Sequence, residues 1–175
     1  MPAFHDPRQF PFVATLEAGY PTVLAELQAL AGTDFREAPD SLTTVADGYD
    51  ETGWHYLSLC GGAHDALPQA KCPRTRDLLA LVPGLVNAGF SLFRPGTHLY
   101  PHCGELPGVL RCHLGLVIPA GDVGIRFGAE TRRWQAGRCL VFDDTYEHEA
   151  WNHAASDRIV LLVTFRRAGA PETGS

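Results

Sequence analysis

The chain has 175 residues, of which 45% are hydrophobic and 19% charged, and its formal net charge is −6. This composition predicts a globular protein with a substantial core, and we expect residues 1–175 to form a single domain. The negative balance argues against nucleic acid as a partner, and no stretch approaches the roughly 20 apolar residues that a membrane span requires.

The N-terminal half predicts few regular elements. Residues 1–14 contain Pro7 and Pro11, which favour an extended arm, and they lack the charged-then-apolar pattern of an export signal. The five cysteines are odd in number and never spaced as CxxC, which is typical of reduced thiols, so we expect a cytoplasmic protein. The predicted elements are a helix over 21–31, an irregular stretch over 33–53, a strand over 54–60 and a short helix over 73–81.

From residue 90 onward, short strands alternate with turns. Glycine, proline and aspartate mark the turns, and no helical pattern intervenes. The predicted strands are 90–93, 97–100, 110–118, 123–127, 138–142, 147–151 and 159–165. This spacing indicates a mainly β protein with flanking helices, built as a sandwich or barrel whose core spans about residues 54–167.

Two histidines of this region form a candidate metal site. Imidazole suits iron, zinc and copper, and an oxygenase site needs two imidazoles with open positions for O2 and a cosubstrate. We assign these roles to His102 and His148. The usual non-haem arrangement adds a carboxylate two residues after the first histidine, but Gly104 stands there. From spacing alone, both histidines could equally be surface or hydrogen-bonded loop residues.

The segment that contains His148 gives a second signal. GRCLVFDDTYEHEAWN is similar to the second conserved box of cupin-type jelly rolls, whose metal histidine falls on His148. Arg158 lies ten residues later and directly precedes the apolar run IVLLVTF. A strand, a tight turn and a returning strand would bring Arg158 into the barrel, where a buried guanidinium needs a partner such as a carboxylate.

At this point the sequence resembles the aspartyl/asparaginyl β-hydroxylase family of Fe(II)- and 2-oxoglutarate-dependent oxygenases. The resemblance is carried by FSLFRPGTHLYPHCG, LRCHLGLVIP, ETRRWQAG and FDDTYEHEAWN. It implies a double-stranded β-helix (a cupin-like jelly roll) and hydroxylation of an unactivated C–H bond, with consumption of O2 and release of succinate and CO2. The family has glycine at the position of Gly104, so the missing carboxylate fits the resemblance.

The resemblance also implies residue roles. His102 and His148 are similar to the iron ligands, and Asp144 matches a carboxylate that orients water on the open iron position. The residues that would bind 2-oxoglutarate are Arg158, Ser91, Arg111, His113 and Trp54. Read without the resemblance, Ser91 and His113 could be satisfied core residues, Trp54 simple packing and Asp144 a turn residue.

Two departures bear on the substrate. Family members that hydroxylate aspartyl residues hold the substrate carboxylate with two arginines, and Val109 and Tyr49 stand at those positions here. A buried carboxylate without its charge partners costs several kcal/mol. We therefore expect a small amino-acid-like metabolite or a peptidyl residue as substrate, with Arg94, Arg126 or Arg132 near any anionic group. Related lipid acyl-chain hydroxylases carry membrane anchors, and we expect none here.

Three other interpretations stay open on the sequence alone. The first is a peptidyl-aspartate β-hydroxylase proper, and the second is a cupin-like metal-binding module without turnover. The third is a thiol or aromatic dioxygenase of related fold, which would leave Arg158 unexplained. The stereochemistry and the oligomeric state are not predicted.

Overall fold

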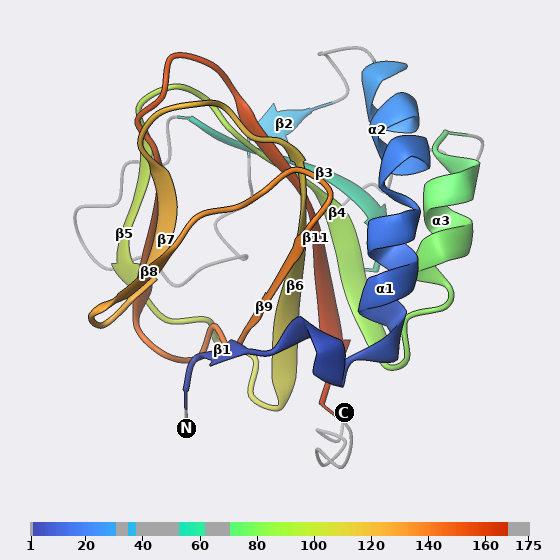
Figure 1. The fold of residues 1–175 in the computed structure, drawn as a ribbon, viewed down its shortest axis with the longest axis horizontal. Helices are drawn as coiled ribbons and strands as arrows, with labels where there is room; N and C mark the ends of the chain where they lie inside the picture. The colour runs from blue at the N-terminus through green and yellow to red at the C-terminus, as the bar shows by residue number, and fades with distance from the viewer. Residues whose placement is uncertain (1, 31–34, 38–52, 62–70, 168–175) are drawn as a thin grey trace.

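The computed structural model describes residues 2–30, 35–37, 53–61 and 71–167, which form two facing antiparallel sheets with helices on one side (Figure 1). The strands of the larger sheet are β1 (Phe4–His5), β2 (Arg36–Glu37), β3 (Trp54–Cys60), β4 (Leu85–Phe93), β6 (Val109–Val117), β9 (Cys139–Phe142) and β11 (Arg158–Arg166). Those of the smaller sheet are β5 (Thr97–His102), β7 (Val123–Phe127), β8 (Glu130–Arg132) and β10 (His148–Asn152). The strand orders are β1-β9-β6-β11-β4-β3-β2 and β5-β10-β7-β8.

From β4 onward the chain passes repeatedly from one sheet to the other. Strands β4, β6, β9 and β11 belong to the larger sheet, and the strands between them belong to the smaller one. Each neighbouring pair is antiparallel. This alternation is the winding of a double-stranded β-helix, so the fold class expected from the sequence is confirmed.

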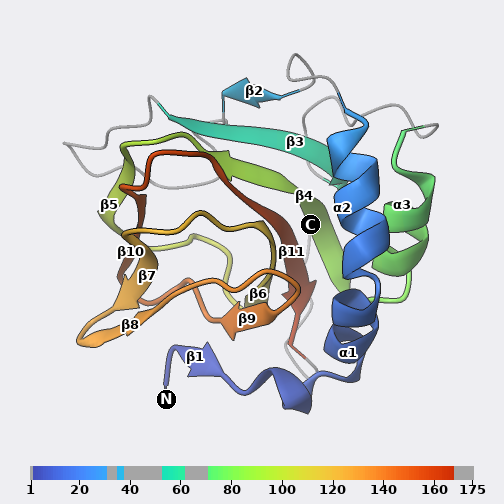
Figure 2. The same cartoon turned by 45° about the horizontal axis from the view of Figure 1, so that its top comes forward.

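The helices cover the outer face of the larger sheet (Figure 2). They are the 3-10 helix η1 (Pro7–Gln9) and the α-helices α1 (Pro11–Ala18), α2 (Tyr20–Gln28) and α3 (Pro73–Leu79). Leu16 of α1 and Val23 of α2 are fully buried and share one hydrophobic core with Leu161 and Val163 of β11. The core therefore draws on the first thirty residues as well as on the predicted span. None of the described helices is long and apolar enough to cross a membrane.

The prediction of an extended arm over residues 1–14 is wrong. Pro11 is the first residue of α1, where proline loses no hydrogen bond because the first N–H groups of a helix have no partner within it. Phe12 and Leu16 fall on the buried face of this helix. The two prolines thus mark the start of η1 and α1 instead of an extended stretch.

The strands and helices that were predicted agree with the structure within a few residues, except that β4 begins at Leu85, five residues before its predicted start. Besides η1 and α1, the short strands β1, β2 and β8 were not predicted. The division of the chain into domains stays a prediction.

Alternation along β11 determines which side chains face the space between the sheets. Leu161, Val163 and Phe165 point to the helices and join their core. Arg158, Val160 and Leu162 point the other way, toward the smaller sheet, because successive strand residues face opposite sides. The space between the two sheets is where the predicted site residues meet.

Candidate active site

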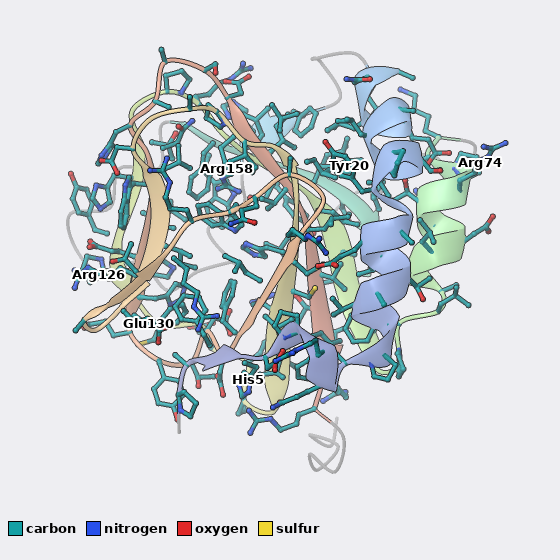
Figure 3. All side chains as sticks on the ribbon, in the orientation of Figure 1. His5, Tyr20, Arg74, Arg126, Glu130 and Arg158 are labelled. Carbon is teal, nitrogen blue, oxygen red and sulfur yellow. The ribbon has the colours of Figure 1, made fainter. Side chains whose placement is uncertain are left out.

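One pocket between the sheets is bordered by all eight predicted site residues. They are Trp54, Ser91, His102, Arg111, His113, Asp144, His148 and Arg158. Figure 3 shows Arg158 in the space between the sheets, whereas Arg126 lies on the outer side of the smaller sheet. Six different strands and the turn that contains Asp144 bring these side chains together, although they are up to 104 residues apart in the sequence.

The two candidate metal ligands are direct cross-strand partners. His102 ends β5 and His148 begins β10, and their ring centroids are 4.3 Å apart. The Nδ1 of His102 lies 2.7 Å from the carbonyl oxygen of Tyr100, and that of His148 lies 2.9 Å from the carbonyl oxygen of Tyr146. A carbonyl oxygen can only accept, so each Nδ1 carries the proton and each Nε2 holds the lone pair that a metal needs.

Burial keeps both imidazoles neutral. Desolvation lowers the pKa of His102, and desolvation together with the neighbouring His102 lowers the pKa of His148 to about 4. Neutral imidazole is the form that binds a metal. The two rings are therefore ready for metal binding at neutral pH.

These shifts predict that the metal-free protein loses stability as the pH falls from 6.5 to about 4. In that window the unfolded chain protonates His148 and the folded protein does not, so acid favours unfolding. One pKa unit corresponds to about 1.4 kcal/mol, so the contribution of His148 is on the order of 3 kcal/mol at pH 4. Urea unfolding at pH 7, 5.5 and 4 measures it. The His148→Gln variant should show a shallower pH dependence, and an unchanged slope would contradict the assignment.

A carboxylate approaches the histidines from Asp144 instead of position 104. Asp144 Oδ2 accepts a 2.6 Å hydrogen bond from Arg111 Nε, and the N–H of Gly104 donates to the Asp144 carbonyl oxygen at 2.7 Å. Asp144 Oδ1 is buried and has no hydrogen-bond partner among the described residues. Within the described part of the chain, no three His, Cys, Asp or Glu side chains form a metal-binding group. The residues therefore fit a metal held by two histidines, with Asp144 Oδ1 left to accept from a metal-bound water.

Gly104 has to be glycine because Asp144 occupies the space beside it. A Cβ at position 104 would lie 2.5 Å from the Asp144 carboxylate. We expect Gly104→Asp to weaken iron binding by about tenfold or more, because two carboxylates would compete for one space. The double variant Gly104→Asp, Asp144→Ala removes the clash and should recover part of the affinity. An anaerobic iron titration measures both, and tighter binding by the single variant would show that position 104 can supply a ligand.

The same pocket holds a buried arginine that has no acidic partner among the described residues. Arg158 is 1% exposed, and its guanidinium lies over the rings of Phe93 at 3.5 Å and Trp134 at 4.7 Å. Its Nε has no hydrogen-bond partner among the described residues, and its Nη1 reaches only the Ser91 carbonyl oxygen at 3.4 Å. Burial lowers the pKa of Arg158 to about 9. A buried cation of this kind calls for an anionic ligand.

Two hydrogen-bonded pairs of side chains also line the pocket. Trp54 Nε1 donates to Ser91 Oγ at 3.1 Å, which leaves the Ser91 hydroxyl proton free to donate. Trp134 Nε1 donates to His113 Nδ1 at 3.3 Å, so His113 carries its proton on Nε2. Burial, followed by the charges of Arg158 and Arg111, holds the pKa of His113 well below its usual value. His113 is thus a neutral donor.

Sequence reasoning missed two residues that build this pocket. Trp134 supports both Arg158 and His113, and its position in ETRRWQAG gave no sign of that contact. Asn152 is fully buried and donates to the carbonyl oxygens of Phe93 and Ser156, which fixes the turn that returns the chain to Arg158. The sequence did offer a signal for Asn152, because it is the polar residue that ends the cupin-like box.

The residues that were expected to bear on the substrate lie as follows. The arginines expected near an anionic group, Arg94, Arg126 and Arg132, are paired with Asp157, Glu149 and Glu130, respectively. Val109 is 4% exposed and lies two residues before Arg111 on β6, so this position carries no charge. Tyr49 lies outside the described residues.

Comparisons with known proteins give the family of the chain. A family model described as aspartyl/asparaginyl beta-hydroxylase matches residues 17–168. The ornithine lipid ester-linked acyl 2-hydroxylase of Rhizobium tropici is 40% identical over 169 residues, covering 94% of this chain and 60% of that protein. The aspartyl/asparaginyl beta-hydroxylase of Homo sapiens is 47% identical over 96 residues, covering 52% of this chain and 13% of that protein.

The chain is shorter than these relatives and spans less than two thirds of each. Among solved structures, a prolyl-4-hydroxylase from Pseudomonas putida has a TM-score of 0.49 and 20% identity, covering 97% of this chain and 91% of that one. The family model covers most of the chain, including every residue that borders the pocket. The chain belongs to the aspartyl/asparaginyl β-hydroxylase family.

Proposed function

We propose that the protein is an Fe(II)- and 2-oxoglutarate-dependent dioxygenase that hydroxylates an unactivated C–H bond. The observation that carries the proposal is the pairing, in one pocket, of two neutral imidazoles with a buried arginine that has no acidic partner among the described residues. Iron bound by the two imidazoles would supply, together with 2-oxoglutarate, the activation of O2 that such a hydroxylation needs, and succinate and CO2 are released.

Different residues of the pocket would bind the metal and the cosubstrate. His102 and His148 would hold the metal through Nε2, and the carbonyl oxygens of Tyr100 and Tyr146 orient the two rings. Arg158 would bind the distal carboxylate of 2-oxoglutarate, with the Ser91 hydroxyl as a second donor.

The other polar side chains act on the metal-chelating end of 2-oxoglutarate. Arg111 and the Nε2–H of His113 would donate to its oxygens, while Asp144 keeps Arg111 in place. Trp54 closes the pocket from β3, and with Phe93, Trp134 and Phe142 it excludes bulk water. The protein thus supplies orientation and a dry pocket.

Succinate release tests the reaction class. Protein loaded with Fe(II) in air should convert 2-oxoglutarate to succinate and CO2 in equal amounts, and the rate should rise when substrate is added. A cupin-like module that only binds metal would release no succinate, and this result would overturn the proposal.

We propose a small amino-acid-like metabolite or a peptidyl residue as the substrate. The buried, uncharged Val109 beside Arg111 argues against a peptidyl-aspartate β-hydroxylase proper, because a carboxylate there would lack a charge partner. An ester-linked acyl chain is a second candidate, since the relative from Rhizobium tropici is named for that activity. A mass-spectrometric screen for the gain of one oxygen, with amino acids, short peptides and acylated amino acids, distinguishes them. We place the protein in the cytoplasm.

A further inference from the structure

An irregularity in β5 turns His102 into the pocket. Trp151 and Ala150 of β10 pair with His98 and Leu99 of β5, but His148 pairs with His102, so two steps on β10 match three on β5. Leu99 borders the pocket, and strict alternation would place position 102 on the outer face. The extra residue is a β-bulge, which reverses the alternation and brings His102 to the same side as His148.

The bulge consists of Tyr100 and Pro101. Both are exposed on the outer face of the smaller sheet, with Tyr100 at 45%. Proline has no N–H to donate to a neighbouring strand, so Pro101 suits an interruption of the pairing. The Tyr100 carbonyl oxygen is also the atom that faces His102 Nδ1. The position of Tyr100 therefore sets both the side on which His102 emerges and the orientation of its ring.

Side chains on the outer face clamp this bulge. The Glu149 carboxylate on β10 accepts from Arg126 Nε of β7 at 2.6 Å and faces His98 Nε2 of β5 at 3.2 Å. The His98 ring in turn stacks on Tyr100, with centroids 4.4 Å apart and planes 11° from parallel. The contacts run across all three strands that meet at the histidine pair and end on the bulge itself. We call Arg126, Glu149, His98 and Tyr100 the outer clamp.

We propose that Glu149 and His98 are positioning residues, which fix the bulge and thereby the geometry of the two imidazoles. This inference rests on the proposed function. Glu149 separates His148 from Ala150 and holds β5 to β10 at the step where their backbone pairing is irregular. The side chains of the clamp lie on the opposite face of the sheet, and the Tyr100 carbonyl oxygen connects the bulge to His102 Nδ1.

The test measures iron affinity in variants of the clamp and of a matched control. Glu149→Gln and Tyr100→Leu weaken the clamp at its two ends, and we expect each to lower iron affinity about tenfold, as loss of outer ligand contacts does in other metal sites. The control is Glu130→Gln, because Glu130 pairs with Arg132 on β8 of the same sheet and is not part of the clamp. The control should bind iron as the unaltered protein does.

Two readouts separate positioning from general stability. Anaerobic iron titration with 2-oxoglutarate gives the affinity, and ¹⁵N NMR of the metal-free protein reports whether Nδ1 of His102 still carries its proton. Thermal unfolding shows whether each variant is folded. If Glu149→Gln does not fold, Tyr100→Leu alone tests the clamp. Folded variants that bind iron within twofold of the unaltered protein would overturn the clamp. Failure of the unaltered protein itself to bind iron would overturn the proposed function instead.

Discussion

Replacing Arg158 by glutamine is expected to raise the concentration of 2-oxoglutarate needed for half-maximal succinate release by at least about 100-fold. Arg158 is fully buried over two aromatic rings, and no described residue neutralises it. Removing one partner of a buried ion pair costs about 3–5 kcal/mol, and each 1.4 kcal/mol is tenfold in affinity. The measurement is succinate release against 2-oxoglutarate concentration, together with direct binding of 2-oxoglutarate to the iron-loaded protein.

Arg132 provides the matched control for Arg158. Its guanidinium also lies over an aromatic ring, that of Phe4 at 4.2 Å, but it pairs with Glu130 and does not border the pocket. Arg132→Gln should therefore leave the 2-oxoglutarate dependence unchanged. If Arg158→Gln released succinate at the same 2-oxoglutarate concentrations as the unaltered protein, the distal carboxylate would be bound elsewhere.

Replacing either His102 or His148 by alanine is expected to reduce iron affinity by at least about 100-fold and to abolish succinate release. The structure offers two imidazoles and no third converging ligand among the described residues, so each would supply half of the protein's bonds to the metal. Loss of an outer partner of a metal ligand already costs 10–100-fold, and loss of the ligand itself costs more. Anaerobic titration of the folded variants with Fe(II) gives the affinities.

His55 is the control for the histidine pair. It lies on β3 of the larger sheet, where its Nδ1 faces the carbonyl oxygen of Gly53 at 3.3 Å, and it does not border the pocket. His55→Ala removes an imidazole without changing the pocket, so its iron affinity should match that of the unaltered protein. Retained iron binding in both His102→Ala and His148→Ala would place the metal at other residues.

Much of the fold follows from local patterns in the sequence. Seven short apolar runs and the turns between them are enough to predict a β-sandwich or barrel, because strand alternation and turn chemistry are properties of neighbouring residues. Helix α1 was missed because proline is common both in extended segments and at the first position of a helix, and Pro11 could be either. Burial of Phe12 and Leu16 against the larger sheet decides between them, and burial is not visible locally.

Local sequence patterns predict less of the site than of the fold. A histidine count and a spacing cannot show that His102 faces inward, since plain alternation from Leu99 gives the opposite answer. The bulge at Tyr100 and Pro101 is a tertiary feature that depends on β10. Likewise, Gly104 looks like a missing ligand until the Asp144 carboxylate is seen beside it. The resemblance to a family supplied these answers before their physical reasons were available.

The central claim is that one pocket holds iron and 2-oxoglutarate together, with two imidazoles at one end and Arg158 at the other. Anaerobic addition of 2-oxoglutarate to the protein with one equivalent of Fe(II) tests it directly, because chelation of the metal by 2-oxoglutarate produces a visible charge-transfer band. We predict a band that saturates at one 2-oxoglutarate per protein and that His102→Ala and His148→Ala lose. No band in the unaltered protein, or one that both histidine variants retain, would contradict the claim.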